Sequence, residues 1–235
     1  MSTFLTQLES DSNRFPAPHH ALSEPNGLLA MGGDLKPERL LAAYHNGIFP
    51  WYPAHHPILW WSPDPRALLA PEQLHISRSM AKWLRHHEYQ IWINRQFMQV
   101  VQACAAPRRD SDDTWINEEL MLSYQLLHAR GDAHSIEVWS DNELVGGLYG
   151  ISVGRLFCGE SMFSRQVNTS KLALIALCHH FAHHGGALID CQMRTDHLAS
   201  LGVSEWSRQH FIKQLKQLRD ESLTPGCWET QQVSL

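Results

Sequence analysis

Two polar side chains follow an apolar run near the end of the chain and are the first candidates for chemistry. In "GALIDCQM" (residues 186–193), Asp190 and Gln192 come after two glycines and a short apolar run, a pattern that predicts a mostly buried strand. Alternation along a strand puts Asp190 and Gln192 on one face, with Ile189 and Cys191 on the other. The plain alternative is a strand end that meets water. A buried carboxylate instead needs a partner, and it can orient a carboxamide toward a reacting amine or carbonyl.

A second candidate is Glu160 in "RLFCGESMFS" (residues 155–164). Its neighbours Phe157, Met162 and Phe163 are apolar, and an ionisable group in such surroundings is more often functional than a surface carboxylate is. The alternative is an edge strand with Glu160 turned outward. By residue type alone, the Phe and Met side chains are more typical of core than of a binding pocket.

Aromatic residues gather in Pro-rich or polar segments. They are Trp51, Tyr52, Trp60 and Trp61 in the Pro-rich loops, Trp115 in "DDTWIN" and Tyr124 on the following helix. Such rings can be platforms on which nucleobases stack, or they can pin loops to the core. The sequence leaves both interpretations open.

Basic residues form stripes on two predicted helices. Arg78, Lys82 and Arg85 are spaced i, i+4 and i+7, and Lys213, Lys216 and Arg219 do much the same on the last helix. A basic stripe usually marks a solvated face, and the alternative is contact with phosphates.

Five His-His pairs are a further unusual feature of the sequence, which holds sixteen histidines. His179 and His183, or His180 and His184, would share a helix face as zinc ligands can, but no HExxH motif accompanies them. We therefore expect solvent-facing histidines, no metal site and no cofactor.

The elements that must position these residues fall into two units. Residues 14–66 are rich in Pro and Gly around one predicted helix in "DLKPERLLAAYHNG", and "SPDPR" joins them to the rest. From Leu68 the order is α-β-α-α-β-β-β-α-β-α, with an Asp-Asn turn and a Gly turn between the three central strands. We predict an α+β fold with a small N-terminal α/β domain (1–66) and a larger catalytic domain (67–235).

Composition restricts the class of protein. The chain has 235 residues, 43% hydrophobic and 18% charged, with a net charge of -5. It has neither a signal-like start nor a run of about 20 apolar residues, so we expect a soluble cytoplasmic protein without membrane contact. The net charge argues against nonspecific coating of nucleic acid but permits a local basic patch.

Long and rare strings occur in a fixed order along the chain. They include "EPNGLLAMGGDLKPERLLAAYHNGIFPWY", "PILWWSPDPRALL", "LFCGESMFS" and "LIDCQ". Together they resemble the leucyl/phenylalanyl-tRNA–protein transferase family over nearly the whole chain. The resemblance implies a C-terminal domain similar to the GNAT acyltransferases. It also implies transfer of Leu or Phe from Leu-tRNA or Phe-tRNA to proteins with N-terminal Arg or Lys, which marks them for degradation by the N-end rule pathway. We expect a monomer.

The resemblance also assigns roles to positions that match the family's motifs. It makes Asp190 and Gln192 the catalytic pair and Glu160 a polar site residue. The apolar aminoacyl pocket would consist of Leu148, Phe157, Met162, Leu174, Leu177 and Ile189. The 3′-adenosine of the tRNA would meet Trp51 and Trp115 with Tyr44 and Tyr124 nearby, and the tRNA backbone would meet Arg78, Lys82 and Arg85. Ile189 in the pocket conflicts with simple alternation, and a twist or bulge near the strand's end would reconcile the two.

Two rival functions are separable from this one. A GNAT-type acetyltransferase would need a Gly-rich loop for the pyrophosphate of acetyl-CoA, and the corresponding segment here, "SRQVNTSK", has no glycine. The second rival is a noncatalytic protein that binds tRNA or a nucleotide by stacking bases on the tryptophan rings.

Overall fold

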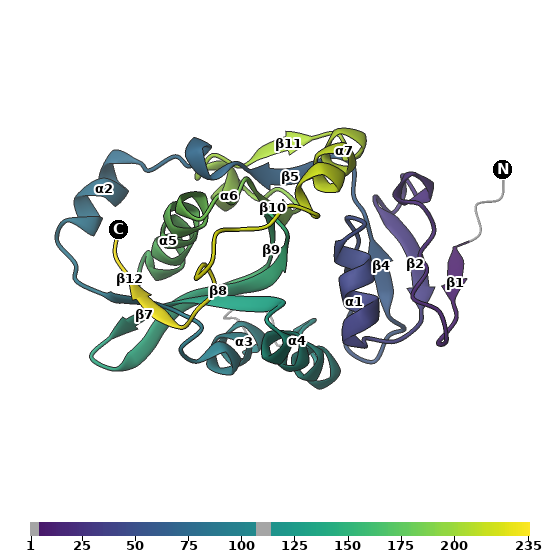
Figure 1. Cartoon of the computed structure of the whole chain (residues 1–235), viewed down its shortest axis with the longest axis horizontal. Helices are drawn as coiled ribbons and strands as arrows, with labels where there is room; N and C mark the ends of the chain where they lie inside the picture. The colour runs from purple at the N-terminus through teal and green to yellow at the C-terminus, as the bar shows by residue number, and fades with distance from the viewer. Residues whose placement is uncertain (1–4, 107–113) are drawn as a thin grey trace.

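The computed structural model describes residues 5–106 and 114–235. A four-stranded sheet in the order β1-β2-β4-β3 forms the N-terminal unit, at the right of Figure 1. Its strands are β1 (Thr6–Leu8), β2 (Leu28–Gly32), β3 (Phe49–Pro50) and β4 (Leu59–Trp61), with helix α1 (Pro37–Tyr44) and the 3-10 turn η1 (Pro18–His20) beside them.

The larger sheet has eight strands in the order β11-β5-β10-β9-β8-β7-β6-β12. The bounds are β5 (Arg66–Leu69), β6 (Gln90–Ile93), β7 (Ala133–Ser140), β8 (Glu143–Val153), β9 (Leu156–Ser164), β10 (Leu188–Gln192), β11 (Ser204–Trp206) and β12 (Gln231–Val233). Strands β9 and β10 run parallel, and their pairing ends at Cys158 and Asp190 although β9 continues to Ser164. The two strands therefore part at the end where Glu160 and Gln192 lie.

Helices cover both faces of this sheet (Figure 1). On one face lie α3 (Phe97–Ala105) and α4 (Glu118–Arg130), and on the other lies α5 (Thr169–His183). The remaining helical segments are η2 (Pro71–Gln73), α2 (Arg78–Leu84), α6 (Asp196–Ala199) and α7 (Arg208–Leu218). None of the helices within the described part of the chain combines the length and the apolar character needed to cross a membrane.

Local sequence signals set several of these bounds. Asn117 caps α4 by accepting from the Leu120 amide at 3.0 Å, and Gly131 ends the helix with a left-handed backbone at φ 82°. Asp141 and Asn142 both have positive φ values, as the tight turn between β7 and β8 requires. The Asp-Asn turn matches the one predicted from the sequence.

The core lies in two clusters, one for each face of the larger sheet. One joins the N-terminal unit to α3 and α4 through residues such as Leu40, Trp60, Val100 and Leu120. The other lies under α5, around Phe181. The N-terminal unit therefore packs into a core shared with the larger sheet.

The mixed helix and strand composition is confirmed, as are all ten elements predicted from Leu68 onward. Sequence reasoning missed β1 to β5, α6, β11 and β12, and it began the last helix too early, because Ser204–Trp206 is strand β11. Strand β5 begins at Arg66, the last residue of the predicted N-terminal domain, and the boundary between 66 and 67 stays a prediction.

Candidate active site

Strand β10 carries a bulge where its polar residues lie. Asp190 pairs with Leu68 of β5, whereas Gln192 pairs with Ala67, so Cys191 is an extra residue. Gln192 has φ 63°, a backbone region that side-chain-bearing residues rarely adopt. The expected bulge is therefore present, and it turns the side chain of Gln192 away from simple alternation.

The prediction that Asp190 and Gln192 share one face is wrong. Ile189, Cys191 and Gln192 all line the same cavity, whereas Asp190 lies behind the strand, 1% exposed, against Arg66. The physical reason is the extra residue, because one added residue reverses the side-chain alternation beyond it. Asp190 reaches Gln192 through the main chain instead: its Oδ1 accepts from the Gln192 amide at 2.9 Å.

Glu160 also occupies a bulge, in the neighbouring strand β9. Tyr149 of β8 pairs with Ser161 and Gly150 pairs with Gly159, so Glu160 is the residue left over. Its side chain is 8% exposed and points into the gap where β9 and β10 part. The alternative of an outward-facing Glu160 is excluded.

A hydrogen-bonded cluster forms around this carboxylate. Gln192 Nε2 donates to Glu160 Oε1 at 2.8 Å, and the Tyr124 hydroxyl donates to Oε2 at 2.7 Å. The Tyr44 hydroxyl lies 3.5 Å from that of Tyr124. The two polar candidates from separate sequence motifs are thus direct partners.

Burial controls the electrostatics of the cluster. Loss of hydration raises the pKa of Glu160 from 4.5 to about 7, although hydrogen bonds from Tyr124 and Gln192 oppose the rise. The same burial lifts the pKa of Tyr44 and Tyr124 well above 10. Near neutral pH Glu160 can therefore exchange a proton, whereas the tyrosine hydroxyls remain donors.

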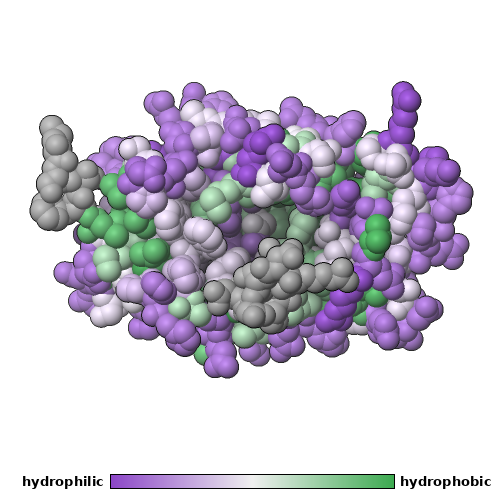
Figure 2. Space-filling model, turned by 180° about the vertical axis from the view of Figure 1, so that it is seen from behind, coloured by the Kyte–Doolittle hydropathy of each residue, from purple (hydrophilic) through white to green (hydrophobic). Residues whose placement is uncertain are grey.

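A cavity of about 400 Å³ opens beside this pair. Figure 2 shows the molecule hollowed near the middle of the face opposite that of Figure 1. All six predicted pocket residues line the cavity: Leu148, Phe157, Met162, Leu174, Leu177 and Ile189. Glu160 and Gln192 supply carboxylate and carboxamide groups, and the rest of the wall is mainly apolar. A small apolar side chain with a polar end group fits this lining.

The aromatic candidates separate into two groups. Trp51, 42% exposed, and Trp115 line the cavity, whereas Tyr44 and Tyr124 are buried behind Glu160. Trp60 and Tyr52 are also buried. Trp60 and Tyr52 therefore pin loops to the core, whereas the role of Trp51 and Trp115 as stacking platforms stays a prediction.

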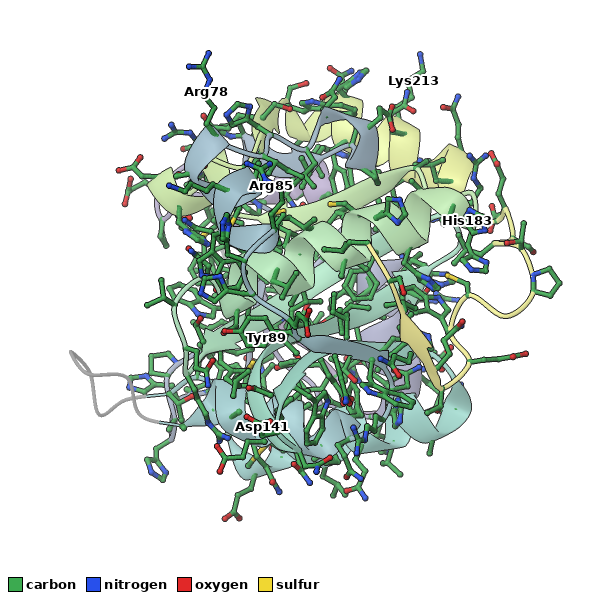
Figure 3. All side chains as sticks on the ribbon, turned by 90° about the vertical axis from the view of Figure 1, so that its left-hand side faces the viewer. Arg78, Arg85, Tyr89, Asp141, His183 and Lys213 are labelled. Atoms are coloured by element: carbon green, nitrogen blue, oxygen red, sulfur yellow. The ribbon has the colours of Figure 1, made fainter. Side chains whose placement is uncertain are left out.

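The basic stripe of α2 lies outside the cavity. Ser77 caps the helix by accepting from the Met80 amide, and Arg85 follows its last turn. Figure 3 shows Arg78 extending from the edge of the molecule, away from its body.

Several lining residues escaped sequence reasoning, among them Cys191, Met193, Thr195, His197 and Leu198. The last three belong to or cap α6, a four-residue helix with no periodic signal. Arg66 was missed as well, since a single arginine after a proline carries no motif.

The histidine pairs form no cluster suited to a metal within residues 5–106 and 114–235. The expectation that they face solvent is wrong for His180, which is buried and bonded through Nε2 to the Cys227 carbonyl at 2.7 Å. His180 lies on the side of α5 that faces the C-terminal segment around Cys227, so its ring joins the helix to that segment.

Comparison with known proteins assigns the family. A family model described as "Leucyl/phenylalanyl-tRNA protein transferase" matches residues 68–216, and one described as its N-terminal domain matches residues 33–64. Curated relatives named "Leucyl/phenylalanyl-tRNA--protein transferase" are similar over the full length. Those of Aeromonas hydrophila and Tolumonas auensis are each 57% identical over 235 residues, all of both chains. That of Yersinia enterocolitica is 57% identical over 98% of this chain and 97% of its own.

Among solved structures, L-PGS from Bacillus licheniformis aligns over 69% of this chain and 55% of its own, with 13% identity and a TM-score of 0.38, too distant to carry an argument. The family models and the full-length relatives agree with the strings quoted from the sequence. The chain therefore belongs to the leucyl/phenylalanyl-tRNA–protein transferase family.

Proposed function

We propose that this chain transfers Leu or Phe from aminoacyl-tRNA to the N-terminal Arg or Lys of acceptor proteins. The observation that carries the proposal is the hydrogen bond between buried Glu160 and half-buried Gln192 at the wall of a mainly apolar cavity of about 400 Å³. The cavity offers room for one side chain, and the pair offers a hydrogen-bonding surface where the ester and the amine would meet.

The reaction is aminolysis of an ester that the tRNA has already activated. The amide product is more stable than the ester, so the step itself requires neither ATP nor a metal. An α-amino group has a pKa of roughly 7.7–8.0, and an appreciable minority of it is neutral and nucleophilic at pH 7. Orientation of the two reactants can then supply roughly 7–11 kcal/mol of the barrier.

Gln192 and Glu160 would have different roles toward the substrate. Because Gln192 Nε2 donates to Glu160, its Oε1 is the atom that can accept from the attacking amine. Glu160 would hold a substrate amino group, since its carboxylate favours a cation and its pKa of about 7 permits proton exchange. Asp190 acts through the main chain of Gln192, and Tyr44 and Tyr124 act through Glu160. The ribose hydroxyl of the tRNA is the alternative acceptor of the proton.

Specificity for Leu and Phe follows from the apolar lining. Burial of such a side chain against Leu148, Phe157 and Leu177 would contribute roughly 1.5–3 kcal/mol. Val and Ile are branched at Cβ, close to the backbone, and a narrow cavity entrance would reject that added width.

The tRNA would be held at two places. Its 3′-adenosine would stack on Trp51 and Trp115 at the cavity. Its phosphates would meet Arg78, Lys82 and Arg85 on α2, so donor affinity should fall as the salt concentration rises.

The wider assignments rest on the family. We infer a monomeric cytoplasmic enzyme whose products enter N-end rule degradation, with a larger domain (67–235) related to the GNAT acyltransferases. The parallel β9–β10 pair that parts beside the cavity, with helices on both sheet faces, supports the relation. Failure of β7 to β10 to superimpose on the corresponding strands of GNAT enzymes would refute the relation.

Transfer of radiolabelled Leu from Leu-tRNA to a peptide beginning with Arg tests the function. We expect product with N-terminal Arg or Lys and with Leu-tRNA or Phe-tRNA, and little with Val-tRNA or with a peptide beginning with Glu. Acetylation of the same peptide by acetyl-CoA would instead favour a GNAT-type acetyltransferase. Tight Leu-tRNA binding without product would favour a noncatalytic binder.

A further inference from the structure

Arg66 is a buried arginine directly behind the candidate active site. It begins β5 and is 1% exposed. Its Nε and Nη2 donate to the two carboxylate oxygens of Asp190 at 2.8 and 2.7 Å. This bidentate geometry fixes the plane of the carboxylate as well as its position.

The guanidinium is itself held from other directions. Its centre lies 4.8 Å from the ring centroids of both Phe49 and Phe211. Its Nη1 donates to the Gly47 carbonyl at 3.2 Å. These contacts come from the N-terminal unit and from α7, so the arginine is anchored independently of β10.

The carboxylate that Arg66 fixes supports a strained backbone. Asp190 Oδ1 also accepts from the Gln192 amide at 2.9 Å, and Gln192 has φ 63°. A residue with a side chain adopts such a conformation only when its surroundings hold it there. The conformation is also what aims the Gln192 carboxamide at Glu160.

We propose that Arg66 is a positioning residue for the transfer reaction: through Asp190 it holds the bulge that directs Gln192 into the cavity. The inference rests on the proposed function. A lysine cannot replace Arg66, because an ammonium group offers neither the bidentate fork nor a plane that stacks between two rings.

A pair of variants separates positioning from stability. Arg66→Met alone leaves the Asp190 carboxylate buried without its partner, which destabilises the fold. Arg66→Met combined with Asp190→Leu removes both charges and should restore most of the urea denaturation midpoint. The rate of Leu transfer from saturating Leu-tRNA should nevertheless stay about 100-fold below that of the parent, with donor Kd within about twofold.

The matched control is the pair of Arg39 and Asp34 in the N-terminal unit. Arg39 is fully buried and bonds Asp34 Oδ1 at 3.1 Å, and neither residue lines the cavity. Arg39→Met with Asp34→Leu should keep the transfer rate within about twofold of the parent.

A further variant covers the case in which the double substitution does not fold. Arg66→Lys keeps the charge, and we expect a folded protein with kcat lowered at least about tenfold at unchanged donor Kd. Parental kcat in Arg66→Lys, or recovery of the rate together with the midpoint in the double variant, would overturn the inference. A parent protein that transfers no Leu would instead overturn the proposed function.

Discussion

Replacement of Glu160 by Gln should make the stability of the protein less dependent on pH. The folded chain holds a proton on Glu160 up to about pH 7, whereas an exposed glutamate releases it near 4.5. Protonated Glu160 therefore favours folding below pH 4.5, and this contribution is lost as the pH rises through 7. The rise from 4.5 to about 7 corresponds to about 3 kcal/mol.

The new side chain in Glu160→Gln cannot titrate but keeps the size of the glutamate. Its carbonyl can accept from Gln192, and its amide can donate to the Tyr124 hydroxyl. The free energy of unfolding of the variant, relative to the parent, should thus rise by about 2–3 kcal/mol between pH 5 and pH 8.5. Urea denaturation at several pH values measures this difference, because titrations elsewhere in the chain cancel.

The control is Glu143→Gln at the exposed start of β8. For this variant, the free energy of unfolding relative to the parent should change by less than about 0.5 kcal/mol between pH 5 and pH 8.5. If the free energy of unfolding of Glu160→Gln relative to the parent stays constant from pH 5 to pH 8.5, burial does not raise the pKa of the Glu160 carboxyl group.

Three predictions concern the binding of the donor. Leu148→Phe should narrow the cavity and lower kcat/KM for Phe-tRNA about tenfold relative to Leu-tRNA, measured in parallel transfer assays, because overpacking costs about 1–3 kcal/mol. Trp51→Ala should raise the Kd for aminoacyl-tRNA by about 5- to 100-fold in filter binding, since stacking of one base contributes about 1–3 kcal/mol. Substitution of Arg78, Lys82 and Arg85 together by Ala should flatten the slope of log K against log salt by about 2–3.

Each of these has an outcome that contradicts it. An unchanged Phe-to-Leu ratio in Leu148→Phe would place the side chain elsewhere. Trp92→Ala, which removes an aromatic ring from β6 outside the cavity, is the control for Trp51, and equal effects would argue against stacking. A parental salt slope in the triple variant would show that the phosphates contact another surface.

Much of the larger domain could be predicted because its elements carry strong local signals. Helix α4 has a polar cap and a terminal glycine, and β7 and β8 are joined by two residues suited to positive φ. The strands of the N-terminal unit escaped prediction because they are two to five residues long and lie among prolines. Their pairing depends on partners distant in sequence, which local patterns do not reveal.

The candidate site was predicted in its residues but not in its geometry. Glu160 and Gln192 both stand at bulges, and alternation assigns the wrong face once an extra residue enters a strand. The contact between Arg66 and Asp190 could not be predicted from local sequence patterns, because the two residues are 124 positions apart. The family resemblance identified the six pocket residues that the structure brings together, whereas residue type alone favoured core.

The proposed role of Gln192 is tested most sharply by the single-turnover rate of Leu transfer in Gln192→Ala. The measurement uses saturating Leu-tRNA and a peptide with N-terminal Arg, with donor Kd determined separately. Because Gln192 is the group aimed from the strained bulge toward Glu160, we expect a rate at least about 100-fold below the parent at a nearly unchanged Kd. A parental rate at parental donor affinity would show that the carboxamide takes no part in the transfer.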